Sequence, residues 1–213
     1  MSLRLVPGER CGTMRLRYVL PLALALTLAP VPRLRALDVA LSQEDIERAL
    51  AIARGSQAER ARFHSRYLFA TNDATVTQLE VTTEFRRFVV TAEDRLQHGD
   101  WMFAQGTRAA ERALAPRRGQ MTIVARLRFN PLNTYISVPA FEISLGVPSL
   151  DSRTTAQYAP PIPSQKDTAT SLVGALLETD FAAASIGQTA RPVSVLLNGK
   201  ELTRVTVDFA HIE

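Results

Sequence analysis

Four charged residues near the middle of the chain are its best candidates for binding chemistry: Glu80, Glu84, Arg86 and Arg87. They lie on both sides of residues 82–83, where the hydrophobic period changes from that of a strand to that of a helix. Acids and arginines gathered at such a junction could bind a carboxylate or a sugar. The alternative, which we favour, is a salt-bridged surface, because charged side chains usually face water.

His98 and Trp101 are two further candidates. His98, close to Asp100, could act as a base or a ligand. We favour an exposed histidine at a helix C-terminus, where the helix dipole stabilises the protonated ring. Trp101 is followed by Met102 and Phe103 and could form an exposed contact patch, although a core anchor after the helix is the interpretation we prefer.

The sequence lacks the motifs of the common catalytic classes. It has three histidines, none of them at the spacing of a helical metal site, and no HExxH. It also has no G-x-S-x-G, no P-loop and no dinucleotide fingerprint. The single cysteine, Cys11, precedes the apolar run at 18–29, so a chain cleaved after that run carries no thiol. We therefore predict no catalytic residue, no cofactor and no metal.

The first 36 residues have the layout of a secretory signal peptide. Arg15 and Arg17 precede the apolar run at 18–29, and this run is too short to cross a bilayer comfortably. Because the two arginines are not adjacent, we expect Sec-type export to the periplasm or the outside. Met14 is an alternative start. An uncleaved anchor and an interior helix are the other interpretations, and only the anchor would hold the chain at a membrane.

The charge of the chain is concentrated in this leader. Six of the 25 basic residues but one of the 21 acidic residues precede residue 37, which leaves a net charge of about −1 for the rest. A body without net positive charge has no long-range attraction for polyanions. We therefore expect no nucleic acid among the partners.

Capping residues divide the first half of the chain into helices. Ser42 and Ser56 are each followed by acids in the first turn, as at the N-termini of helices. Thr82 or Thr83 can cap a third helix at the end of a strand. The predicted elements are helices at 42–55, 56–64, 83–97 and 107–114, and strands at 67–69 and 76–82.

Alternation of apolar and polar residues predicts a β-rich second half. The phase of this alternation changes at Pro139, which indicates a bulge or kink. Residues 168–184 fit both a helix and a strand, and we favour the strand. The predicted elements are strands at 121–129, 134–147 and 168–184, a long loop at 148–167 and a β-hairpin at 192–209.

Asn198 and Gly199, between two β-branched runs, are the strongest hairpin signal in the chain. A two-residue loop would place Val193 opposite Arg204 and divide the apolar residues between two faces. A three-residue loop at 197–199, with a left-handed Gly199, pairs odd with odd residues. We predict this second register, because it gives one apolar face that consists of Val193, Val195, Thr203, Val205, Val207 and Phe209.

Together these patterns predict an α+β fold over residues 37–213, as a single domain. N-terminal helices would pack on an antiparallel sheet, or on a small β-sandwich, formed mainly by residues 120–209. With an export leader and no catalytic motif, we expect a non-catalytic binding or assembly protein with an envelope protein as its partner. The alternative is an envelope hydrolase whose acidic residues converge only in the fold, first of all Glu80, Glu84 and His98. A deep pocket holding these side chains would favour the enzyme, whereas an open sheet edge would favour the binding protein. The oligomeric state stays open.

Overall fold

Two antiparallel sheets and an N-terminal group of helices make up the part of the chain that the structure describes. The structure, a computed structural model, describes residues 41–100, 103, 112, 114–130, 132–159 and 171–212. The predicted leader, Trp101 and most of the helix predicted at 107–114 lie outside these residues. The arrangement confirms the predicted α+β class.

The three N-terminal helices begin at the capping residues that the sequence indicates. Ser42 and Ser56 each form a capping box, with the side chains of Asp45 and Glu59 respectively. Thr83, one of the two predicted caps, accepts a hydrogen bond from the amide of Arg86. The helices are α1 (Gln43–Arg54), α2 (Gln57–Ser65) and α3 (Glu84–Gln97), and the short helical turns are η2 (Ala115–Arg117), α5 (Ala183–Ile186) and η3 (Phe209–His211).

The larger sheet has five strands and the smaller sheet has three. In the larger sheet the order is β1-β2-β3-β6-β5, with β1 (Leu68–Ala70), β2 (Val76–Thr82), β3 (Gln120–Arg128), β5 (Ser149–Tyr158) and β6 (Leu172–Ala182). In the smaller sheet the order is β4-β7-β8, with β4 (Phe141–Ser144), β7 (Ala190–Leu197) and β8 (Lys200–Asp208).

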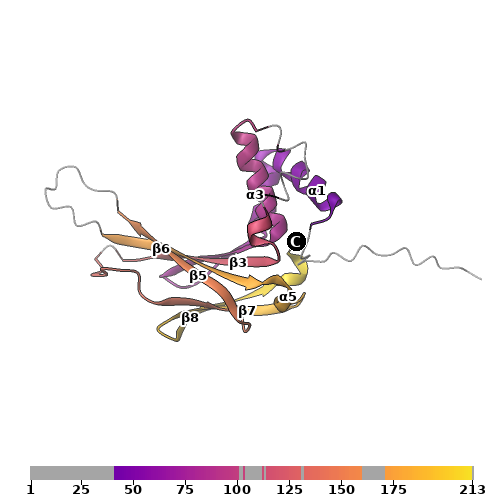
Figure 1. Cartoon of the computed structure of the whole chain (residues 1–213). Coiled ribbons are helices and arrows are strands. Elements are labelled where there is room, and N and C mark those ends of the chain that lie inside the picture. The colour runs from indigo at the N-terminus through magenta and orange to yellow at the C-terminus, as the bar shows by residue number, and fades with distance from the viewer. Residues whose placement is uncertain are drawn as a thin grey trace, which may run out of the picture. The chain divides into compact units, whose positions relative to one another are not determined.

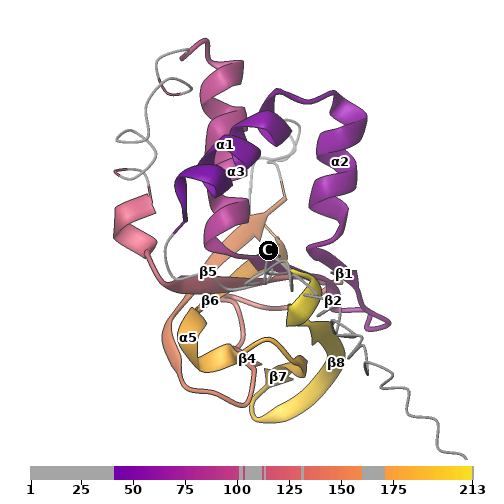
Figure 2. The same cartoon turned by 90° about the vertical axis from the view of Figure 1, so that its right-hand side faces the viewer.

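The larger sheet lies between the helices and the smaller sheet (Figures 1 and 2). Both predicted arrangements are therefore present, because the two sheets form a sandwich and the helices stand on its outer side. The larger sheet also includes β1 and β2, so it begins earlier in the chain than the predicted range of 120–209.

The two faces of the larger sheet differ in polarity. On the central strand β3, Met121, Ile123 and Ala125 are buried and pair with residues of β6 on the same face. The alternate positions Thr122, Val124 and Arg126 pair with Asp180, Glu178 and Leu176 on the opposite face. The helices stand over this second, polar face (Figure 1). Their contacts with it are consequently polar as well as apolar.

The C-terminal hairpin has the predicted pairing but not the predicted loop. Val193 pairs with Val205 and Val195 with Thr203, so odd residues face odd residues as expected. The loop, however, has only two residues, Asn198 and Gly199, both with positive φ, and Leu197 pairs with Lys200. The change of register falls between Val195 and Leu196 of β7, where the ladder has a β-bulge. The predicted apolar face is buried at its valines 193, 195 and 207 and at Phe209, and half-buried at Thr203 and Val205.

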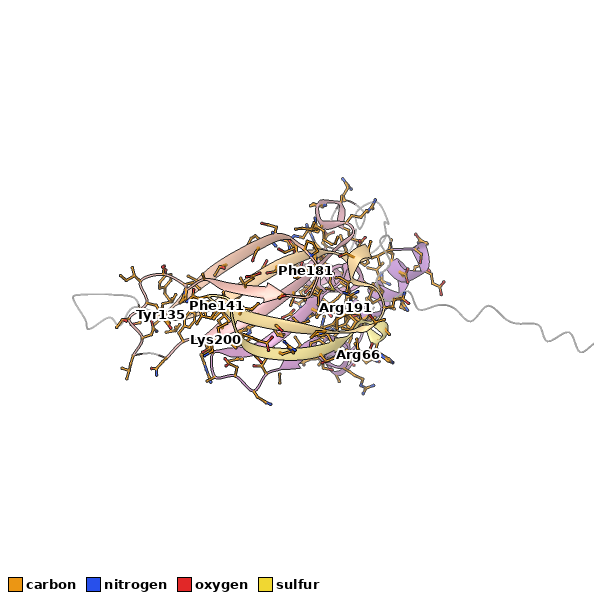
Figure 3. All side chains as sticks on the ribbon, turned by 90° about the horizontal axis from the view of Figure 1, so that it is seen from below. Arg66, Tyr135, Phe141, Phe181, Arg191 and Lys200 are labelled. Carbon is orange, nitrogen blue, oxygen red and sulfur yellow. The ribbon has the colours of Figure 1, made fainter. Side chains whose placement is uncertain are left out.

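The strand predicted at 134–147 is wrong for its first half. Only β4 is a strand, and residues 134–140 cross from the larger to the smaller sheet. Asn133 holds the start of this crossing by donating a hydrogen bond from its side-chain amide to the carbonyl of Leu172, at 2.8 Å. Tyr135 packs edge-on against Phe129 with 5.4 Å between ring centroids. Tyr135, Phe141 and Lys200 lie at one end of the sandwich when it is seen from below (Figure 3).

The long loop predicted at 148–167 is wrong for residues 149–158, which form β5, and its residues 160–167 lie outside the described residues. This strand pairs with β6 from Ser149 to Tyr158, with register shifts at Ser149/Asp151 and at Gln157/Tyr158, and has no partner on its other side among the described residues. Most of its side chains are exposed. An edge strand without apolar alternation carries no periodic signal, which is why the sequence pattern missed it.

Candidate functional site

The predicted cluster of Glu80, Glu84, Arg86 and Arg87 is brought together where α3 meets the polar face of the larger sheet. Arg86 is buried, at 5% exposure. Its guanidinium lies 2.7 Å from the Glu80 carboxylate and donates to the carbonyl of Val81 at 2.6 Å. It also lies over the ring of Tyr67, 5.0 Å from the centroid. Arg86 therefore attaches the first turn of α3 to β2, and the favoured interpretation of a surface salt bridge is wrong for this residue.

Glu84 is the second buried member of the cluster. Its carboxylate accepts a hydrogen bond from the amide of Gly119 at 3.0 Å, just before β3 begins. Burial raises the pKa of Glu84 above its usual value, and the hydrogen bond from Gly119 opposes this rise. The side chain thus connects α3 with the chain segment that enters the sheet.

Arg87 makes a third connection between the helix and the sheet. It donates to the carbonyls of Arg117 and Gln120, at 3.2 and 3.3 Å, and to the hydroxyl of Thr122 at 2.9 Å. Burial lowers the pKa of Arg87, and the neighbouring charge of Arg117 lowers it further. Its hydrogen-bonding capacity is directed into the protein rather than towards a ligand.

Thr122 extends this cluster across the polar face of the sheet. Its hydroxyl donates to the buried Asp180 at 2.5 Å. The other oxygen of Asp180 accepts from Arg153 of β5 at 3.1 Å, and Arg153 also contacts Glu178 at 3.2 Å and Asp151 at 3.3 Å. Sequence reasoning missed Asp180, Glu178 and Arg153. The signal that could have found them is cross-strand pairing, since Thr122 faces Asp180 and Glu178 faces Arg153.

His98 does not join this network. It follows the last residue of α3, and its side chain is 75% exposed. Its ring contacts the carbonyl of Asp94 at 2.7 Å, in the last turn of the same helix. This is the exposed helix-end histidine that we favoured. Trp101 lies outside the described residues.

A pocket of about 380 Å³ lies between the helices, and none of the predicted candidates is among its lining residues. Its lining residues are Ala53, Arg54, Arg60, Glu93, Leu96 and Gln97. Beside it, His64 Nε2 lies 3.0 Å from both carboxylate oxygens of Glu93, and Arg60 Nε lies 3.7 Å from one of them. The sequence pattern did not indicate this pair, because His64 and Glu93 belong to different helices. Across the described parts of the chain, no three His, Cys, Asp or Glu side chains gather as metal ligands. None of the described helices is long and apolar enough to cross a bilayer.

The outer edge of β5 is an unpaired backbone edge of the larger sheet among the described strands. The amide of Phe129 in β3 donates to the carbonyl of Val173 in β6, so residues 174, 176 and 178 of β6 direct their backbone groups to the other side, towards β5. The backbone amides and carbonyls of the β5 residues opposite them point back towards β6. The amides and carbonyls of Ser152, Thr154 and Ala156 consequently point outward, where no described strand pairs with them.

The geometry therefore presents a buried polar network that positions α3, a small helical pocket and an open sheet edge. Comparison of the chain with protein-family models, with curated proteins and with solved structures found no match.

Proposed function

We propose that this chain is an exported, non-catalytic binding or assembly protein that holds an extended segment of a partner along the open edge of β5. The observation that carries the proposal is the length of this edge. β5 has ten residues and ends the five-stranded sheet, with outward-pointing backbone donors and acceptors at alternate positions.

The sequence of β5 supports this role because its regular part, 151–157 between two register shifts, lacks the lysine, the proline and the short length that often protect a free edge. Natural edge strands are commonly short, or carry lysine or proline, which discourages pairing with other chains. At the opposite edge of the same sheet, β1 has three residues. β5 has neither lysine nor proline. Its two charged residues, Asp151 and Arg153, contact each other and the polar face of the sheet.

The predicted site residues Glu84, Arg86 and Arg87 act as structural contacts within the protein. Glu84, Arg86 and Arg87 make hydrogen bonds to the protein's own backbone, which stabilises the base of α3. None of these residues lines the helical pocket, where Glu93 is the one acidic lining residue.

Affinity capture from the native envelope, after chemical cross-linking, tests the proposal. Thr154→Lys places a charge in the middle of the β5 edge at an exposed position. Thr206→Lys is the matched control, because Thr206 is also an exposed threonine of an edge strand, β8. We expect the unaltered chain and Thr206→Lys to capture the same partner, and Thr154→Lys to lose it. Equal capture by all three would contradict the proposal.

A hydrolase is the second candidate, because the hydrogen-bonded pair of His64 and Glu93 lies beside the helical pocket. A histidine oriented by a carboxylate can act as a general base. A broad hydrolase screen tests this candidate. The hydrolase candidate requires turnover that is lost in His64→Gln and in Glu93→Gln. Turnover should be kept in Arg95→Gln, because the side chain of Arg95 on α3 is largely exposed. Absence of turnover, or turnover unaffected by the first two substitutions, rules against it.

Export is tested by N-terminal sequencing of the chain isolated from its native envelope. We expect a terminus close to residue 37, after removal of the leader. An intact terminus at Met1 or Met14 would instead support a tether.

A further inference from the structure

We propose that the segment paired with β5 is β5 of a second copy of this chain, arranged about a two-fold axis at Thr154. This inference rests on the proposed function, because it names the partner of the same edge. Two identical strands paired about a two-fold axis are antiparallel, and the axis runs perpendicular to their sheet. The five-stranded sheet of one copy would then continue into that of the other.

The direction of the backbone groups restricts the register. Outward-pointing residues must face each other to exchange hydrogen bonds, and in β5 these are the even-numbered residues such as Ser152, Thr154 and Ala156. Symmetric registers that satisfy this condition are centred on one residue, which then faces itself. The regular part of β5 is 151–157, and the centres Arg153 and Thr154 keep most or all of it in the ladder.

Charge decides between these two centres. A centre at Arg153 places two guanidinium groups directly opposite each other, which is destabilising. A centre at Thr154 moves Arg153 opposite Thr155 of the second copy and places Asp151 opposite Gln157 of the second copy. Every charged side chain of β5 then faces a neutral one.

The extent of the regular ladder favours the same centre. The pairing of β5 with β6 is regular at 151–157, between register shifts at Ser149/Asp151 and at Gln157/Tyr158. With Thr154 at the axis, every residue of 151–157 faces a residue of the same segment in the second copy. A centre at Arg153 would place Ala156 and Gln157 opposite the irregular start of the second strand.

Single cysteines in β5 test the register directly. The chain has one cysteine, so Cys11→Ser provides a thiol-free background. Residues that form a hydrogen-bonded antiparallel pair have Cα atoms about 5.5 Å apart, which lies within the range of a disulfide. Under mild oxidation we expect Thr154→Cys to form a covalent dimer, whereas Ser152→Cys and Ala156→Cys form one only when the two variants are mixed. The matched control is Thr206→Cys on β8, which is expected to stay monomeric.

The mass in solution supplies the second measurement. Light scattering should give about twice the mass of one chain for the thiol-free chain, and Thr154→Lys in the same background should halve that mass. A single-chain mass at every concentration, or cross-linking of Ser152→Cys alone as efficient as that of Thr154→Cys, would overturn the inference.

The experiments distinguish a failure of this inference from a failure of the proposed function. A monomeric chain that still captures another envelope protein, and loses it in Thr154→Lys, overturns the second copy as partner but leaves the binding function in place. A Thr154→Lys variant with unchanged mass and unchanged capture overturns both.

Discussion

Arg86 connects α3 with β2 through a buried side chain that contacts Glu80 and the carbonyl of Val81. Arg86→Ala removes the donor for the Glu80 carboxylate and for the carbonyl of Val81. Breaking a buried ion pair costs about 3–5 kcal/mol. We expect the lower end of that range, because the side chain of Glu80 is 28% exposed and can be hydrated. Urea denaturation measures the loss.

Arg95→Ala is the control for this prediction. Its ion pair with Asp100 is longer, at 3.6 Å, and exposed. Exposed pairs contribute between about 0 and 1 kcal/mol, so the free energy of unfolding should change little. Equal losses in Arg86→Ala and Arg95→Ala would contradict the assignment of Arg86 as the residue that attaches α3 to β2.

Glu84 predicts a dependence of stability on pH. Burial raises its pKa above the usual 4.5, so the folded chain holds this proton more tightly than the unfolded chain. The resulting stabilisation is fully present below pH 4.5 and is lost as the pH rises through the pKa of the folded state. Glu84→Gln stays neutral and avoids this loss. Its stability relative to the unaltered chain should therefore increase as the pH is raised from 4 to 7, measured by urea denaturation; a difference independent of pH would contradict the prediction.

At the residue scale, the sequence could indicate which residues meet but not what they bind. Glu84 and Arg87 were assigned to one junction from the change of period alone. Their partners are the amide of Gly119 and the hydroxyl of Thr122, more than thirty residues away. Such contacts depend on how α3 stands on the sheet, and no local pattern encodes that.

At the scale of elements, the C-terminal hairpin depends on its turn. Asn198 has φ 51° and Gly199 has φ 76°, the left-handed region in which a Cβ atom is unfavourable. Gly199→Ala should therefore destabilise the chain by about 1–2 kcal/mol, whereas Asn198→Gly should be tolerated because glycine adopts this conformation readily. Thermal unfolding compares the two. A Gly199→Ala chain as stable as the Asn198→Gly chain would contradict the assigned turn.

The elements that the sequence predicted well are those with a cap or with one buried face. Ser42 and Ser56 identify two helix starts, and β3 alternates clearly because only one of its faces is apolar. β5 has neither signal, since it lies at the edge of the sheet. The segment before β4 alternates in sequence, yet it crosses between sheets and leaves Ile136 almost fully exposed. Periodicity reports burial only where an element lies against a layer.

At the scale of the whole molecule, the layers leave different surfaces for different tasks. The smaller sheet covers the apolar face of the larger sheet, and the helices stand on the polar face of the larger sheet (Figure 2). The interior network of Arg87, Thr122 and Asp180 lies under these helices. The edge of β5 stays open on the described surface, and this edge is the basis of the proposed binding function.

Amide hydrogen exchange along β5 tests this central claim most directly. The amides of Arg153 and Thr155 bond to β6, so they should exchange slowly whether or not a partner is present. The amides of Ser152, Thr154 and Ala156 point outward, and we predict fast exchange in the chain diluted until it is monomeric and slow exchange in the assembled state. Fast exchange of these three amides in both states would contradict the account.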